Sequence, residues 1–286
     1  MSAVLLHPNC KINIGLRVLR KRADGYHDLE TLFYPVYGLC DELAVETSEE
    51  AGQQIHFQAE GIAIDCAAED NLIVRCYRRM AAAYPTIGSV EVRFRKHIPY
   101  GAGLGGGSSD AAHMALALNE LFGLGLSREE LCAQVAPLGA DCAFFIYNTP
   151  CFAEGVGDLL RPVAMDLGGL RLVMIKPDVA VSTREAYGGI VPKEEPLAYR
   201  PSEGREWLQR LHNDFEDTVF RVHPELGVIK QRLLDAGAVY AAMSGSGSTV
   251  YGLFECDAES GSDTGLRALE RDFAPMIIFD DTLGHT

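Results

Sequence analysis

A stretch rich in glycine and serine, residues 99–112, has the composition of a phosphate-binding site. It reads Pro-Tyr-Gly-Ala-Gly-Leu-Gly-Gly-Gly-Ser-Ser-Asp-Ala-Ala. Glycine tolerates positive φ, and without a Cβ it lets a ligand approach the peptide plane. An ordinary turn is the alternative, but a turn needs only one or two glycines. The candidate phosphate-binding residues are Pro99, Tyr100, Gly101, Ala102, Gly103, Leu104, Gly105, Gly106, Gly107, Ser108 and Ser109.

The flanking segments predict a strand before this stretch and a helix after it. Val90, Val92 and Phe94 alternate with charged residues, which is the period of a half-buried strand. Residues 111–121 are rich in alanine and leucine and favour a helix. A glycine loop that ends in a helix N-terminus presents free N–H groups and the positive end of the helix dipole, which attract phosphate. Ser108 and Ser109 are either N-caps or ligands of a phosphate or metal ion.

The stretch does not match the better-known nucleotide motifs. Gly101, Gly103 and Gly106 fit G-x-G-x-x-G, but Leu126 stands about where a dinucleotide fold needs an acidic residue at a strand end. No G-K-[ST] follows the glycines, and the sequence has neither H-R-D nor D-F-G. A Walker A loop and a protein kinase are therefore excluded.

Composition indicates a globular protein that does not bind nucleic acid generally. Of the 286 residues, 48% are hydrophobic, enough for a large core, and 40 acidic against 25 basic residues give a net charge of -15. The sequence has no apolar run of the ~18 residues that a membrane span needs. Its eight cysteines form no C-x-x-C pair, and no signal peptide precedes them. These features predict a cytoplasmic protein without a zinc site and without a membrane partner, and they leave its oligomeric state open.

Other segments each allow a structural and a functional interpretation. Lys11 lies on a predicted strand, 11–18, on the face opposite its apolar residues, and is either a solvated strand lysine or a side chain that takes part in chemistry. Asp24-Gly25 predicts a tight turn that presents Tyr26 and His27. A helix is expected over 71–84, with Asp70 or Asn71 as its cap, whereas Lys96 alone suggests a surface lysine.

The second half of the chain carries similar signals. Ser127 and Glu130 form a capping box. Asp141, before an apolar run, is either a helix cap or a carboxylate held at the edge of a buried element. Residues 170–175 predict a strand, and 213–216 (Asn-Asp-Phe-Glu) a helix start. A second glycine and serine stretch, 243–250, precedes an apolar strand, and alone it would indicate a hairpin turn.

Four of these segments, in this order, resemble motifs of the GHMP kinases. Residues 8–29 are similar to A-K-I-N-L followed by R-x-D-G-Y-H-x-L, with Cys10 in place of alanine. The glycine stretch resembles the second motif of the superfamily. Residues 139–145 resemble G-A-D-V-P-F-F, with Ala143 in place of proline, and 243–250 look like the third motif.

This resemblance implies an α+β, two-domain GHMP kinase fold. The ATP-binding N-terminal domain, residues 1–158, would be ribosomal protein S5 domain 2-like, and the C-terminal domain, residues 159–286, would be ferredoxin-like. The R-x-D-G-Y-H form is similar to the branch that phosphorylates the 2-hydroxyl of a methyl-erythritol linked to cytidine diphosphate, in the non-mevalonate route to isoprenoid precursors.

The resemblance also assigns roles to residues. It implies a small-molecule kinase that uses ATP and Mg²⁺, with Lys11 and Asp141 as catalytic residues and with metal ligands that stay unknown. Asn71 and Lys96 would lie near the nucleotide. Asn13 would bind the sugar-alcohol part of the substrate. The residues expected to hold the cytosine are Tyr26, His27 and Tyr187.

Overall fold

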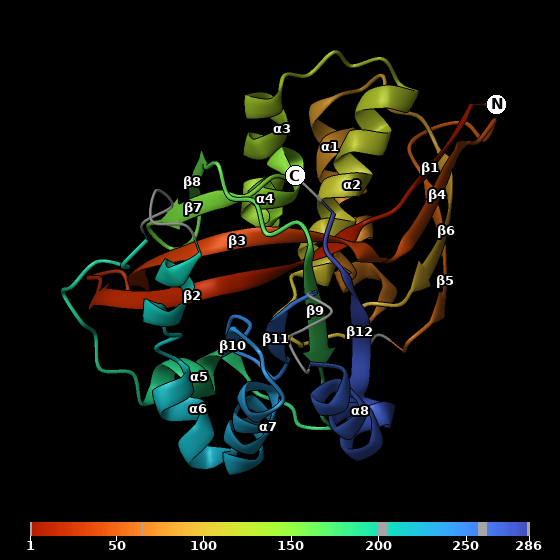
Figure 1. The fold of residues 1–286 in the computed structure, drawn as a ribbon. Coiled ribbons are helices and arrows are strands. Elements are labelled where there is room, and N and C mark those ends of the chain that lie inside the picture. Colours follow the sequence, from red (N-terminus) through yellow and green to blue (C-terminus); the bar gives the residue numbers. More distant parts are fainter. Residues whose placement is uncertain (1, 64–65, 200–204, 257–261, 285–286) are drawn as a thin grey trace. The chain divides into compact units, whose positions relative to one another are not determined.

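The chain divides into two compact units, each assembled from separate stretches. The computed structural model describes residues 2–63, 66–199, 205–256 and 262–284 (Figure 1). Unit 1 comprises residues 1–11, 39–100 and 105–149, and unit 2 comprises 12–38, 101–104 and 150–286. Neither unit is one continuous segment, so the two units do not correspond to a division at a single residue. The division into residues 1–158 and 159–286 stays a prediction.

Unit 1 contains a four-stranded sheet in the order β1-β4-β6-β5. Only β5 and β6 of this sheet pair in parallel. Along β6 buried and exposed residues alternate, with Val90, Val92 and Phe94 buried, which confirms the strand predicted from the sequence. The strands are β1 (Ala3–Leu6), β4 (Glu42–Thr47), β5 (Ile55–Gly61) and β6 (Val90–Lys96).

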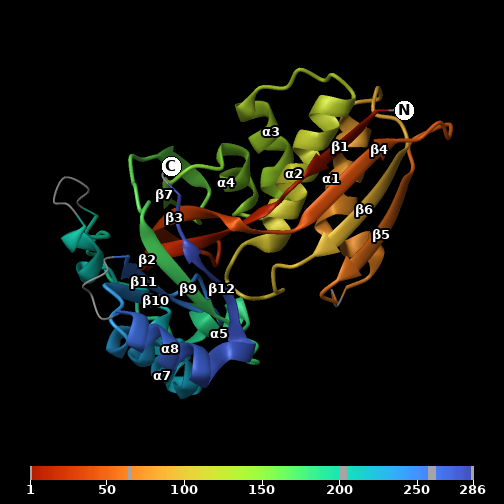
Figure 2. The ribbon, with the colours of Figure 1, turned by 45° about the vertical axis from the view of Figure 1, so that its right-hand side comes forward.

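Two helices, α1 (Leu72–Ala83) and α2 (Gly106–Leu121), cover one face of this sheet, and two further helices pack against them (Figure 2). Asn71 caps the first of them, because its Oδ1 accepts a hydrogen bond from the N–H of Ile73. The predicted capping box of Ser127 and Glu130 is present at the third. The helices are α1 (Leu72–Ala83), α2 (Gly106–Leu121), α3 (Arg128–Val135) and α4 (Cys142–Tyr147), with 3-10 turns at Ala68–Asp70 and Ala136–Leu138.

A second sheet has the order β2-β3-β7-β8. Strands β2 (Asn9–Lys21) and β3 (His27–Cys40) each belong partly to unit 1 and mostly to unit 2. The turn predicted at Asp24-Gly25 connects them, and Gly25 has a φ of 89°. The other strands of this sheet are β7 (Cys151–Glu154) and β8 (Leu159–Pro162). Strand β2 therefore lies at the edge of its sheet.

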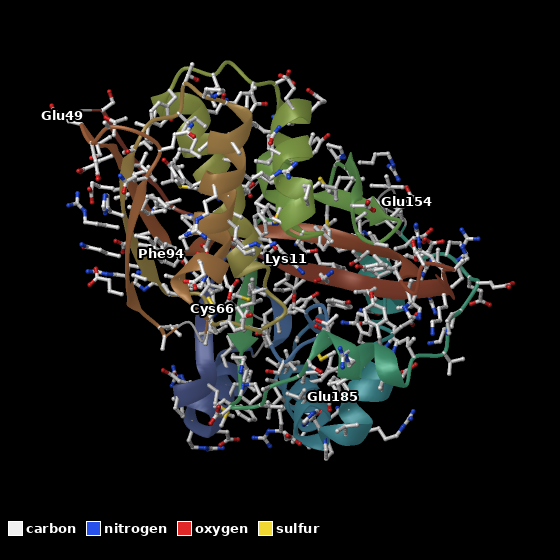
Figure 3. The ribbon with its side chains drawn as sticks, turned by 180° about the vertical axis from the view of Figure 1, so that it is seen from behind. Lys11, Glu49, Cys66, Phe94, Glu154 and Glu185 are labelled. Carbon is white, nitrogen blue, oxygen red and sulfur yellow. The ribbon has the colours of Figure 1, made fainter. Side chains whose placement is uncertain are left out.

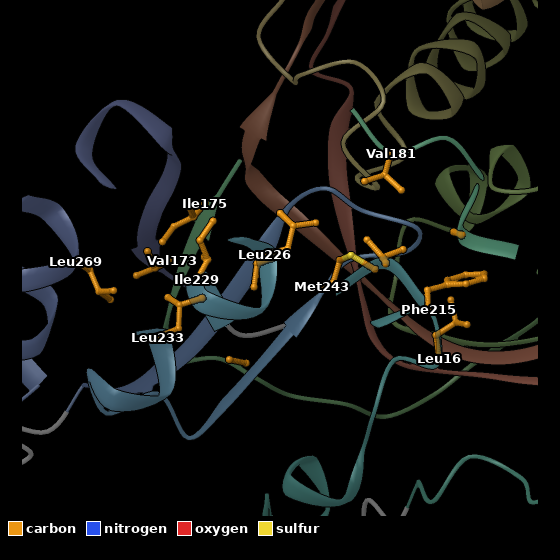
Figure 4. Packing of buried hydrophobic residues seen from close by; sticks show 14 of the residues in the cluster. Leu16, Val173, Ile175, Val181, Phe215, Leu226, Ile229, Leu233, Met243 and Leu269 are labelled. Atoms are coloured by element: carbon orange, nitrogen blue, oxygen red, sulfur yellow. The ribbon is translucent and has the colours of Figure 1, made fainter. Parts of the chain in front are cut away.

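The remaining sheet of unit 2 is antiparallel, in the order β10-β11-β9-β12, and helices pack on one of its faces. Leu226, Ile229 and Leu233 of one helix belong to the same buried apolar cluster as Val173 and Met243 of the sheet (Figure 4). Burial of this apolar surface stabilises the unit. The strands are β9 (Leu170–Ile175), β10 (Tyr240–Met243), β11 (Val250–Glu255) and β12 (Ile277–Thr282). The helices are α5 (Thr183–Gly188), α6 (Glu216–Val222), α7 (Pro224–Asp235) and α8 (Ser262–Phe273), with 3-10 turns at Glu206–Arg210 and Ala274–Met276.

Among the described residues, no helix combines the length and the apolar character that a membrane crossing would need.

Candidate active site

The glycine stretch forms a loop that leads into the N-terminus of α2. Gly101, Gly103 and Gly105 have φ values of 64°, 75° and 70°, in the left-handed region that favours glycine. Gly105 is the N-cap of α2, so the interpretation of Ser108 or Ser109 as the N-cap is wrong. The N–H groups of Gly106, Gly107 and Ser108, in the first turn, have no acceptor within the helix. These three N–H groups can bind an anion.

Close packing explains why two of these glycines carry no side chain. A Cβ on Gly103 would lie 2.0 Å from the carbonyl oxygen of Ser244. A Cβ on Gly105 would lie 3.0 Å from the ring of Phe145 and 3.1 Å from Cε of Lys11. The loop backbone at Gly105 is therefore immediately beside the Lys11 side chain.

The two serines of the first turn face different surroundings. Ser109 is fully buried, and its hydroxyl lies 3.3 Å from Nδ1 of His113. Ser108 is half-buried, next to Cys142. Burial raises the pKa of the Cys142 thiol to about 11, and the hydrogen bond with Ser108 opposes this shift. Of the two hydroxyls, that of Ser108 is the better placed to meet a ligand.

Lys11 and Asp141 form an ion pair, although they are far apart in the sequence. Lys11 comes from β2, and its Nζ lies 3.4 Å from Oδ2 of Asp141. The Lys11 side chain is 4% exposed and that of Asp141 is 30% exposed. Asp141 stands at the N-cap position of α4, but its side chain makes no capping hydrogen bond. Asp141 is therefore a carboxylate held at the edge of a buried element, and its side chain does not cap the helix.

Lys96 is buried between two carboxylates and is not a surface lysine. Its Nζ lies 2.5 Å from Asp41 and 2.8 Å from Asp110. Asp41 also accepts hydrogen bonds from the N–H groups of His97 and Ile98, at the beginning of the glycine loop. This triad joins the end of β6 to the first turns of α2.

The triad has two carboxylates but only one ammonium group. Burial raises the pKa of Asp110 well above its usual range, Lys96 opposes that shift, and the Asp41 charge adds to it. The pKa of Lys96 is raised as well, because the two carboxylates outweigh its burial. One Asp110 oxygen, Oδ1, is buried without a hydrogen-bond partner. A proton held on Asp110 would balance the charge of the triad.

A pocket next to Asn71 could accept a flat apolar group. Its volume is about 390 Å³, and it is bordered by the end of β5 and the segment that leads to α1. Besides Asn71, it is lined by Phe57, Ala59, Glu60, Gly61, Ile62, Ala63, Cys66, Ala67 and Ala68. Figure 3 labels Cys66, which is one of these lining residues, and Lys11. The pocket, the Lys96 triad, the Lys11–Asp141 pair and the start of α2 all belong to unit 1.

In unit 2, Asn13 lies in a buried hydrogen-bond network. Its Nδ2 donates to the Thr31 hydroxyl at 3.0 Å, and its N–H donates to Oγ of Ser244 at 3.2 Å. The Ser244 hydroxyl donates to the Gly103 carbonyl at 2.8 Å. Asn13 and Lys11 are two residues apart on β2, so their side chains leave the same face of that strand about 7 Å apart.

The aromatic residues expected at the cytosine are also in unit 2. The rings of His27 and Tyr187 stack with centroids 4.7 Å apart and planes at 20°. Tyr187 makes an edge contact with Phe215, whereas Tyr26 is 66% exposed. Burial, with a smaller effect of the Lys21 charge, lowers the pKa of His27. His27 is therefore neutral at pH 7 and can accept or donate a hydrogen bond.

Sequence reasoning missed four buried residues around these sites: Asp41, Asp110, Asn213 and Ser244. Asp110 and Ser244 lie inside the two glycine-rich motifs, and Asn213 begins the stretch 213–216, for which the sequence indicates a helix start. Asp41 carried no signal, because its partners come 55 to 57 residues later in the chain.

Comparisons with known proteins agree with this geometry. The family model for the GHMP kinases N terminal domain matches residues 71–149, and that for the GHMP kinases C terminal matches residues 200–271. A 4-diphosphocytidyl-2-C-methyl-D-erythritol kinase of Bacteroides thetaiotaomicron is 51% identical over 255 residues, which cover 88% of this chain and 92% of that protein. The enzyme of the same name from Nitratidesulfovibrio vulgaris is 40% identical over 271 residues, with coverage of 88% and 91%.

Solved structures are similar as well. A crystal structure of a 4-(cytidine 5'-diphospho)-2C-methyl-D-erythritol kinase has a TM-score of 0.80 at 34% identity and covers 98% of this chain and 99% of its own. The homoserine kinase of Cytophaga hutchinsonii has a TM-score of 0.73 at 20% identity, with coverage of 100% and 96%. The likeness to homoserine kinase concerns the fold alone. The expected α+β, two-domain fold is confirmed.

Proposed function

Because this chain belongs to the GHMP kinases, and among them to the 4-diphosphocytidyl-2-C-methyl-D-erythritol kinases, we propose that it transfers the γ-phosphate of ATP to the 2-hydroxyl of 4-diphosphocytidyl-2-C-methyl-D-erythritol. This step serves the non-mevalonate synthesis of isoprenoid precursors, and we propose a cytoplasmic location for it.

One observation supports this proposal above the others: a carboxylate and an ammonium group lie beside the phosphate loop. The Asp141 carboxylate is 3.4 Å from Nζ of Lys11, and Cε of Lys11 is 3.1 Å from where a Cβ of Gly105 would be. Phosphoryl transfer requires positioning and neutralisation of charge rather than covalent help. A base and a cation next to an anion-binding loop meet that requirement.

In this proposal, unit 1 binds the nucleotide. The N–H groups at the start of α2 hold the phosphates. The adenine occupies the 390 Å³ pocket next to Asn71. Lys96 acts from within its ion pairs, where it fixes the loop, rather than by touching the nucleotide with its ammonium group.

Asp141 and Lys11 have complementary roles. Asp141 accepts the proton of the substrate hydroxyl as that oxygen attacks the γ-phosphorus. Lys11 orients the Asp141 carboxylate through their ion pair and offsets the charge that develops on the transferring group. The partial exposure of Asp141 leaves its carboxylate accessible to the hydroxyl.

A magnesium ion fits the residues at this loop. Mg²⁺ prefers oxygen ligands and keeps several waters, so one or two protein oxygens are enough. The half-buried Ser108 hydroxyl is the side chain that would hold it. When bound with ATP, the ion neutralises charge on the β- and γ-phosphates.

Residues of unit 2 would hold the acceptor. Asn13 binds the sugar-alcohol part, and its side chain leaves the same face of β2 as that of Lys11. Tyr26 and Tyr187 stack on the two faces of the cytosine, and neutral His27 bonds to its edge. In this scheme the His27 ring leaves its stacked position on Tyr187 when the base binds.

A substrate panel tests the proposed function. ADP release is measured with ATP and, in turn, 4-diphosphocytidyl-2-C-methyl-D-erythritol, 2-C-methyl-D-erythritol 4-phosphate, homoserine and mevalonate. We expect turnover with the first acceptor only, and a product whose phosphorus spectrum has a new monoester at the 2-position. Equal or faster turnover with homoserine or mevalonate would contradict the proposal, and so would ADP release that needs no acceptor.

A further inference from the structure

The segment 212–216 extends the sheet along the free edge of β2. The N–H of Leu16 donates to the carbonyl of His212 at 2.9 Å, and the N–H of Asp214 donates back to Leu16 at 2.8 Å. Two residues further along β2, the N–H of Val18 donates to the Asp214 carboxylate at 2.9 Å. The segment is thus fixed to the same strand that carries Asn13.

Within this segment, the Asn213 side chain is fully buried and uses all of its hydrogen-bonding groups. Nδ2 donates to the carbonyl of Met243 at 2.7 Å and to that of Gly245 at 2.8 Å. Oδ1 accepts from the N–H of Phe215 at 3.0 Å. The two carbonyls stand on either side of Ser244. Binding both carbonyls requires a side chain with two N–H groups on one nitrogen. An aspartate has the same shape, but when it is ionised it can only accept hydrogen bonds.

Ser244, between those carbonyls, links the glycine loop to β2. Its hydroxyl donates to Gly103 and accepts from the N–H of Asn13. A Cβ at Gly103 would lie 2.0 Å from the Ser244 carbonyl, so the two backbones pack as closely as they can. Any movement of Ser244 must therefore shift Gly103, Asn13 or both.

Glu216 holds the same turn from a second side. Its Oε1 accepts from the N–H of Met243 at 2.8 Å, and its Oε2 pairs with Lys230 at 2.5 Å. The amide and the carbonyl of Met243 are thus both bound by side chains of the segment 212–216.

We propose that Asn213 is a positioning residue for phosphoryl transfer. It touches neither ATP nor the acceptor. It holds the peptides on both sides of Ser244, so that Ser244 sets the separation between Gly103 of the phosphate loop and Asn13 of the acceptor site. This inference rests on the proposed function.

The test compares Asn213→Asp and Asn213→Ala with Asn119→Asp and Asn119→Ala. Asn119 is a matched control, because its side-chain amide also holds a turn. Its Oδ1 accepts from the N–H of Leu126 at 2.9 Å, and its Nδ2 donates to the carbonyl of Leu126 at 3.3 Å. Misplacement by about 1 Å can reduce a rate on the order of 100-fold. We expect kcat to fall by about that factor in both Asn213 variants, the dissociation constant of ATP to change less than about threefold, and both Asn119 variants to keep wild-type kcat.

A pH profile separates positioning from a general loss of stability. In Asn213→Asp, the new carboxyl can donate one of the two lost hydrogen bonds when it is protonated. The kcat of Asn213→Asp relative to Asn213→Ala should therefore rise as the pH falls from about 8 to about 6. The proposal would be overturned if this rise were absent, or if either Asn213 variant kept a kcat within threefold of wild type. An equal loss of kcat in the Asn119 variants would also overturn it. Failure of Asn213→Asp to fold, while Asn119→Asp folds, would do the same. Wild-type turnover of the cytidine acceptor is measured first, and its absence would instead refute the proposed function.

Discussion

Replacement of Gly103 by alanine is expected to reduce kcat/KM for ATP on the order of 100-fold. The new Cβ would stand 2.0 Å from the Ser244 carbonyl oxygen, whereas ordinary van der Waals contact begins at 3.4 Å. The loop or the Ser244 turn must therefore move by about 1 Å, which is enough to misplace the phosphates. Alanine at a φ of 75° adds a backbone strain of about 1 kcal/mol.

Gly125→Ala is the matched control for that strain. Gly125 has a φ of 66°, but a Cβ there would meet no atom within 4 Å. We expect this variant to lose about 1 kcal/mol of unfolding free energy and to keep normal activity. Urea unfolding gives the stability of each variant, and a coupled assay of ADP release gives kcat/KM. If Gly103→Ala were as active as Gly125→Ala, close packing at Gly103 would not be what positions the loop.

Two further predictions concern protonation. Asp110→Asn removes a group whose pKa is raised above 3.8 in the folded chain. As the pH rises, the folded wild type loses the proton on Asp110 and becomes less stable, whereas the variant has no such proton to lose. The unfolding free energy of the variant relative to wild type should therefore increase from about pH 5 to about pH 8. A decrease over this range would refute the protonated triad. The pKa of His27 is lowered below 6.5, so KM for the acceptor should stay level down to pH 6.5 and rise only below it. A rise that began above pH 6.5, or that persisted in His27→Asn, would exclude neutral His27 as the group responsible.

Short-range signals predicted much of this structure. The glycine loop, the N-terminus of α2 and the capping box at Ser127 are encoded within a few residues of sequence. Strand β9 was predicted with the bounds that the structure gives, because its apolar run is short and continuous. Such features depend on backbone conformation and capping, which neighbouring residues determine.

Contacts between distant segments could not be predicted in this way. The sequence around Asp141 also suits a helix cap, and the ion pair with Lys11 from β2 distinguishes the two interpretations. Lys96 looks like an exposed strand lysine until Asp41 and Asp110 surround it. In each case a charged side chain is buried because its partner comes from another element, and local patterns do not record that pairing.

Single-turnover transfer of labelled γ-phosphate from ATP to 4-diphosphocytidyl-2-C-methyl-D-erythritol, measured in wild type and in Asp141→Asn, tests the central claim most directly. Loss of a general base should slow transfer by a factor on the order of 10² to 10⁴ while ATP binds with unchanged affinity. Transfer at nearly the wild-type rate in Asp141→Asn would contradict the account.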